Sequence, residues 1–222
     1  MKKILIKKVL AISVISFLFA QILYIIAEPT MAVALTTDNV IVTLTVDSGV
    51  SISDGLDAAM APHIGMSQLK SVGSSSWVVA TNNAAGYTLA VHASTTPALH
   101  KPASPGLADD FNDYTEAISG TPDLWGGVAA GSKEFGFSAR GTDALASFGS
   151  PTTCGNTGTG LPDASAKYKG FSTSDFTIAT KNTVTTPSGV QTYICFAAEQ
   201  GANIYALSGT YTATITGTAT VI

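Results

Sequence analysis

The stretch TYTATITGTATVI, residues 210–222, closes the chain and decides its fold class. Threonine occupies every second position from Thr210 to Thr220, and the positions between are mostly apolar, among them Tyr211, Ile215 and Val221. Successive side chains of a β-strand point to opposite faces, so a period of two is typical of a half-buried strand. We therefore expect a strand whose threonines face solvent and whose other face covers a core or a partner.

The same period recurs upstream. In VIVTLTV, residues 40–46, valine and leucine alternate with the positions that hold Ile41, Thr43 and Thr45, which predicts another strand. Further strand candidates are residues 77–81, 87–92, 114–118, 134–138, 176–180 and 190–197. The first two of these flank NNAAG, residues 82–86, whose Asn and Gly residues tolerate tight turns, so residues 77–92 are expected to form a hairpin.

Several short strands joined by Gly- and Pro-rich connections predict an all-β chain, an antiparallel β-sandwich of the Ig-like or jelly-roll-like kind. After residue 34 no long amphipathic helix is predicted, although residues 54–70 could hold a turn or two of helix. Residues 35–222 are long enough for one domain that buries about 70% of its unfolded surface. Two stretches of this predicted domain, 94–113 and 139–170, are expected to be long loops.

The N-terminus has the pattern of a secretory signal helix. Four lysines within the first eight residues precede an uncharged run over residues 9–27. Ala32 and Ala34 then supply the small residues that a signal peptidase reads, which predicts cleavage after Ala34 and a secreted or cell-surface protein. The uncharged run is close to the ~20 residues that span a bilayer, so an uncleaved anchor, with membrane contact only through this segment, remains the alternative.

Composition limits the partners of residues 35–222. Four of the eleven Lys/Arg and one of the fifteen Asp/Glu lie in residues 1–34, which leaves seven against fourteen and a net charge of −7. The seven cations are scattered along the chain. Nucleic-acid binding requires a basic patch that displaces phosphate counterions, so no nucleic-acid partner is expected.

The chain has two cysteines, Cys154 and Cys195. An even pair in an exported protein is expected to form a disulfide. Here the bond would enclose about 40 residues and would tie a long loop to a strand. Two buried free thiols are the alternative. A redox-active role is not expected, because the sequence contains no Cys-x-x-Cys motif.

An acidic cluster gives the one candidate metal site. Closely spaced carboxylates on a loop are the ligands that Ca²⁺ prefers, although the spacing does not match an EF-hand and an ordinary solvated acidic loop is the alternative. The candidate calcium ligands are Asp109, Asp110, Asp113 and Glu116. Apart from this calcium hypothesis, the sequence predicts no cofactor.

Three aromatic residues lie in or beside the same region: Phe111, Tyr114 and Trp125. Exposed rings on loops can stack on sugar faces, so these residues form a candidate platform for a glycan, with ordinary loop packing as the alternative. The three histidines have no spacing that would bring them together in a metal site or a catalytic triad. No catalytic residue is predicted, and the chain is expected to be non-enzymatic.

Two stretches carry a resemblance to known families. The stretch WVVATNNAAGYTL, residues 77–89, and the closing GTYTATIT, residues 209–216, resemble the WxL-type cell-surface domain of exported bacterial proteins. The closing stretch also resembles coat-U and pilin-like secreted proteins. These resemblances imply a surface β-sandwich, and the WxL-type resemblance implies binding to the cell wall.

The sequence therefore predicts an exported, non-enzymatic β-sandwich with a structural or adhesive role. Its expected partners are the cell envelope, another surface protein, or a second copy of the chain. Strands over residues 40–46 and 210–222 at the two ends suit pairing between copies by strand addition. The alternative function is a glycan- or calcium-binding module that uses residues 109–125.

Overall fold

The computed structural model describes residues 12–21, 40–102 and 109–222. It contains two compact units, residues 1–45 and residues 46–222, which are described separately. In the first unit residues 12–21 are helical. Within the described ranges, no helix is both long and apolar enough to cross a membrane. The predicted cleavage residues Ala32 and Ala34 lie outside the described residues.

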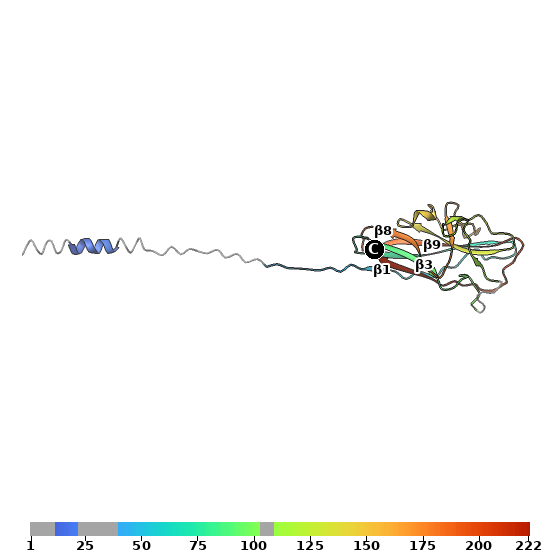
Figure 1. Ribbon diagram of the computed structural model, residues 1–222, viewed down its shortest axis with the longest axis horizontal. Coiled ribbons are helices and arrows are strands. Elements are labelled where there is room, and N and C mark those ends of the chain that lie inside the picture. The colour runs from blue at the N-terminus through green and yellow to red at the C-terminus, as the bar shows by residue number, and fades with distance from the viewer. Residues whose placement is uncertain (1–11, 22–39, 103–108) are drawn as a thin grey trace, which may run out of the picture. The chain divides into compact units, whose positions relative to one another are not determined.

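The second unit is all-β (Figure 1). Its strands are β1 (Val50–Ile52), β2 (Lys70–Thr81), β3 (Tyr87–Ala93), β4 (Asn112–Asp113), β5 (Asp123–Leu124), β6 (Lys133–Gly141), β7 (Lys167–Gly170), β8 (Phe176–Lys181), β9 (Val190–Gln200) and β10 (Ile215–Val221). A single 3₁₀ turn, η1 (Ala146–Phe148), interrupts them in the described part of the chain.

Two sheets pack against each other as a sandwich. The larger sheet has the order β1-β2-β9-β6-β7-β5, with the short β4 pairing in parallel to β6. The smaller sheet has the order β10-β3-β8, and all of its pairs are antiparallel. The long strand β9 lies between β2 and β6 and joins segments from both halves of the sequence. The predicted all-β sandwich is confirmed.

Alternation along the strands builds the core. On β3 the residues Tyr87, Leu89, Val91 and Ala93 are buried while those between are partly exposed. The facing side of the larger sheet contributes an aromatic cluster, in which Phe137 lies 4.5 Å from Phe171 and 5.7 Å from Phe148, measured between ring centroids. Large rings dominate such a core because each one removes much apolar surface from water.

The expected hairpin over residues 77–92 is wrong. Strands are present on both sides of the turn, but β2 pairs with β1 and β9, whereas β3 pairs with β10 and β8. The turn, which ends at Gly86 with a φ of +91°, therefore carries the chain from one sheet to the other. Both strands bury an alternating face, and each finds its neighbours far away in the sequence. The residues of the turn alone do not decide between a hairpin within one sheet and a crossing from one sheet to the other.

Two other expected strands are absent. Residues 114–118 form no strand, and β4 ends at Asp113. Residues 40–49 have no regular secondary structure, although their sequence alternates as a strand does. A strand needs a neighbour for its backbone hydrogen bonds, and alternation does not provide one. Five other predicted strands lie within β2, β3, β6, β8 and β9, whereas the strand predicted over residues 210–222 is shorter in the structure, because β10 spans only Ile215–Val221.

The disulfide Cys154–Cys195 is confirmed. It joins the loop after η1 to the middle of β9, as expected for a link between a long loop and a strand. The predicted loop 139–170 is mostly irregular, but it also contains the end of β6, η1 and β7. The disulfide holds this loop against the outer face of the larger sheet.

Candidate functional site

The outer edge of β10 is the candidate functional site. The smaller sheet ends at β8 on one side and β10 on the other. The edge of β8 is covered, because the Leu145 N–H donates to the Ile178 carbonyl at 2.9 Å and the Thr180 N–H donates to the Asp143 carbonyl at 2.9 Å. In the described part of the chain, β10 pairs with β3 alone, so its other edge has no partner strand.

The composition of this edge leaves it open to pairing. Natural sheet edges are usually protected by lysine, proline, a bulge or a covering segment. Residues 210–222 contain no charged residue and no proline, and the pairing of β10 with β3 runs without a break from Ile215 to Val221. Threonines at the even positions are exposed, while Ile215, Gly217 and Ala219 are half-buried. The short strand β1 lies close to β10 but does not pair with it in the described part of the chain, so the backbone groups of this edge remain a template for another strand.

Trp77 of β2 lies against the face of β10 that is turned toward the larger sheet. A Cβ on Gly217 would lie 2.8 Å from Cε2 of the Trp77 indole, and a Cβ on Gly55 would lie 2.8 Å from its Nε1. The indole is therefore in contact with β10 and with the segment that follows β1. Exposed apolar side chains occur on β1, on the segment after it and on β10: Ile52 is 37%, Leu56 80% and Val221 37% exposed. The open edge is thus bordered by apolar surface that a further strand would cover.

Residues 40–46 are a separate candidate segment for interaction with another chain. Val40, Val42, Leu44 and Val46 are 74–88% exposed, and Ile41 is 89% exposed. The segment carries no charge and no proline. A run of seven residues with this β-propensity and this exposure is unusual for a folded protein, because burial of a Val or Leu side chain is worth about 1.5–3 kcal/mol.

The four candidate calcium ligands have other partners. Asp109 pairs with Lys101 at 2.9 Å, which holds the pKa of this carboxyl below its usual range. Glu116 pairs with Lys169 at 3.0 Å, and Asp113 accepts the Ala98 N–H at 3.1 Å. Asp110 is 4% exposed. Among the residues that the structure describes, no three His, Cys, Asp or Glu side chains are grouped closely enough to hold a metal ion.

The three candidate platform rings are packed into the fold. Phe111 is 3% exposed and belongs to the main core. Tyr114 stacks on Trp125 with ring centroids 4.6 Å apart, and its hydroxyl donates to Asp123 at 2.6 Å. The Trp125 indole N–H donates to Glu199 at 2.6 Å. The acidic and aromatic residues of this region therefore serve local packing and pairing, and the sequence pattern did not reveal these partners.

Comparison of the chain with protein-family models, with curated proteins and with solved structures finds no match. The sequence pattern identified residues 40–46 and 210–222 as candidates for strand pairing, but it did not identify Trp77 as the neighbour of β10. It also overlooked Arg140, the one arginine of the sequence, which lies on the outer face of the larger sheet.

Proposed function

We propose that this chain is an exported structural protein of the cell surface that assembles by strand addition. Residues 40–46 of one copy pair with the outer edge of β10 of the next copy. The observation that carries the proposal is the coexistence of an exposed, uncharged, alternating segment with an uncharged sheet edge that has no partner strand in the described part of the chain. Each supplies what the other needs: backbone hydrogen-bond partners and apolar cover.

The energetics favour this pairing. One face of the segment buries Val40, Val42, Leu44 and Val46, and each of these side chains contributes about 1.5–3 kcal/mol when fully buried. Ordering the segment costs about 1–2 kcal/mol per residue, which offsets much of that gain. Backbone hydrogen bonds along the edge add about 0.5–1.5 kcal/mol each. The favourable and unfavourable free energies are therefore similar in size, and burial of Val40, Val42, Leu44 and Val46 decides whether the pairing forms.

The geometry of the contact predicts the kind of assembly. The donor segment and the acceptor edge are different parts of the chain, so the contact is heterologous. Every copy then offers one donor and one acceptor. Contacts of this kind generate rings if the rotation closes and filaments if it does not. We expect linear polymers, because a single short segment fixes the copies.

The assembly is tested by single substitutions in the donor segment. Leu44→Lys places a charge on the alternating face, while Thr43→Lys places the same charge on the opposite face as a matched control. Both residues are in the segment that lacks regular structure, so neither change is expected to unfold the sandwich. Light scattering after size exclusion, with electron microscopy, should show polymers for the parent and for Thr43→Lys, and loss of polymers for Leu44→Lys.

Two outcomes would contradict the proposal. A parent protein that stays strictly monomeric at high concentration would show that the edge of β10 does not recruit another copy. Equal assembly of both lysine variants would show that the alternating face plays no part. Melting temperatures of the two variants, measured in parallel, confirm that any loss of assembly is not a loss of folding.

Export is a separate element of the proposal and has its own test. It rests on the basic start, the uncharged run over residues 9–27 and the small residues Ala32 and Ala34. The N-terminal residue of the protein recovered from cells should be Leu35, in the medium or the wall fraction. An intact Met1 in the membrane fraction would instead establish an anchored ectodomain.

A further inference from the structure

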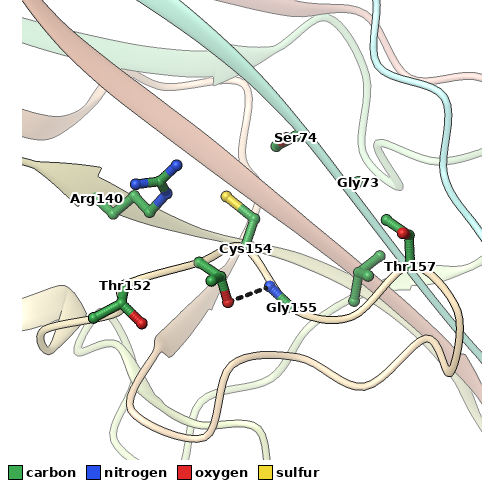
Figure 2. A pocket seen from close by; sticks show the side chains of 9 residues that line it. Gly73, Ser74, Arg140, Thr152, Cys154, Gly155 and Thr157 are labelled. Atoms are coloured by element: carbon green, nitrogen blue, oxygen red, sulfur yellow. Dashed lines mark hydrogen bonds between the residues drawn. The ribbon is translucent and has the colours of Figure 1, made fainter.

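A cavity of about 180 Å³ lies on the outer face of the larger sheet, beneath the loop that the disulfide holds there (Figure 2). Its floor comes from β2 and β6, which contribute Ser74 and Arg140. Its other wall is the loop over residues 152–157, with Cys154 at its centre. Ser74 lies opposite Cys195 on β9, so the disulfide fixes the loop directly over this row of the sheet.

The guanidinium of Arg140 is held in place, and no carboxylate in the described part of the chain neutralises it. It lies over the ring of Tyr193, its cross-strand neighbour, with Cζ 3.8 Å from the ring centroid. Among the described residues it forms no ion pair, whereas four of the lysines do. Its Nε–H is buried and has no hydrogen-bond partner among these residues. A rigid, unpaired arginine in a protein with excess negative charge is a ready donor to an oxyanion.

Hydroxyl groups complete the lining. The Thr153 hydroxyl already bonds to Asp163 at 3.0 Å. The side chains of Ser74, Thr152 and Thr157 make no hydrogen bond to other described residues. Figure 2 shows Arg140 and Thr157 at opposite sides of the cavity, with Cys154 between them. None of the lining residues carries a carboxylate, so no acidic side chain on the cavity wall opposes an anion.

We propose that this cavity binds the carboxylate of an acidic sugar. The planar guanidinium matches a carboxylate, and the unengaged hydroxyls match the hydroxyls of a sugar ring. The cavity volume of about 180 Å³ is more than a bare carboxylate fills. The stacked Tyr193 keeps the guanidinium from folding away, so little side-chain entropy is lost on binding.

The test uses the fact that Arg140 is the one arginine in the sequence. In ¹⁵N-labelled protein its Nε–Hε group gives a single side-chain signal that needs no assignment. Titration with sodium glucuronate should shift this signal in a saturable way. Glucose, the neutral counterpart, and sodium chloride at equal ionic strength should leave it in place.

Further probes identify the ligand class. Acetate and inorganic phosphate should bind at least about tenfold more weakly than glucuronate if the hydroxyls contribute as proposed. Equal binding of these small anions would overturn the assignment to an acidic sugar and define a general oxyanion site.

Variants separate the site from the fold. Arg140→Gln should abolish the response of the Gly155 amide signal to glucuronate. Thr157→Val leaves the Arg140 guanidinium in place and should only weaken the binding of glucuronate. Lys167→Gln removes one positive charge outside the cavity and is the matched control, with affinity unchanged. Absence of any saturable shift in the parent protein, or equal loss in Lys167→Gln, would overturn the proposal. Assembly by residues 40–46 is unaffected in either case, so the two proposals fail independently.

Discussion

The indole of Trp77 lies against the backbone of Gly217, so closely that a Cβ at position 217 would be 2.8 Å from Cε2 and 3.0 Å from Cζ2. Residue 217 is the third residue of β10, and Trp77 lies on β2 of the other sheet. The two sheets thus approach each other at this point because one strand has no side chain there.

Gly217→Ala is therefore expected to destabilise the domain by about 1–3 kcal/mol, since the added methyl forces the indole or the strand to move. The free energy of unfolding is measured by urea titration. Gly131→Ala is the matched control, because a Cβ at that position meets no atom within 4 Å. A loss of similar size in both variants would point to backbone entropy rather than to the contact with Trp77.

Removal of the disulfide by the double substitution Cys154→Ala, Cys195→Ala should lower the free energy of unfolding by about 3–4 kcal/mol. The reason is that the bond closes a loop with a sequence separation of 41 residues and so restricts the unfolded chain. Thermal melts with and without reductant provide the measurement. The parent should lose stability in reductant, whereas a response of the double variant to reductant would contradict this explanation.

Asp113 should make the stability depend on pH. Burial raises the pKa of this carboxyl to about 6, against an opposing effect from the Ala98 N–H that donates to it. The folded state therefore holds the proton more tightly than the unfolded state. The resulting stabilisation is complete below about pH 4 and is lost as the pH rises through about 6.

Asp113→Asn removes this titration and keeps the acceptor oxygen for Ala98. We expect the variant to be more stable than the parent at pH 7 by about 1 kcal/mol, a value reduced from the full shift because the side chain is only half-buried. The advantage should shrink as the pH falls toward 4. Unfolding measured at both pH values checks the sign, and a variant that is less stable than the parent at pH 7 would refute it.

Phe137 is the ring on which the aromatic core depends. It is 1% exposed and contacts Phe148, Phe171 and Phe176. Phe137→Ala should cost about 3–5 kcal/mol through the lost burial and the cavity that it leaves. Tyr205→Ala, at a site that is 52% exposed, serves as the control and should change stability by less than about 0.5 kcal/mol. Equal effects would show that the cluster does not dominate the core.

Sequence patterns predicted most of the strands because alternation is a local property. Residues 87–92, 134–138 and 190–197 all lie within strands of the structure, and the threonines of β10 face solvent as expected. The disulfide was also predicted, since the signal-like N-terminus indicates an oxidising compartment, in which an even cysteine pair is expected to bond. The failures were of another kind. Residues 40–46 have the pattern of a strand but no neighbour, and residues 77–92 have a turn but do not pair across it.

The sequence by itself determined the all-β class, the alternating faces of the strands and the uncharged character of residues 40–46 and 210–222. These follow from side-chain chemistry and from a period of two, which need no information about distant residues. Only the tertiary structure decided which strands are neighbours, that the edge of β10 is open, and that Arg140 lies over Tyr193 beside the disulfide-bound loop. These relationships join residues far apart in the chain, and they depend on packing that no local pattern specifies.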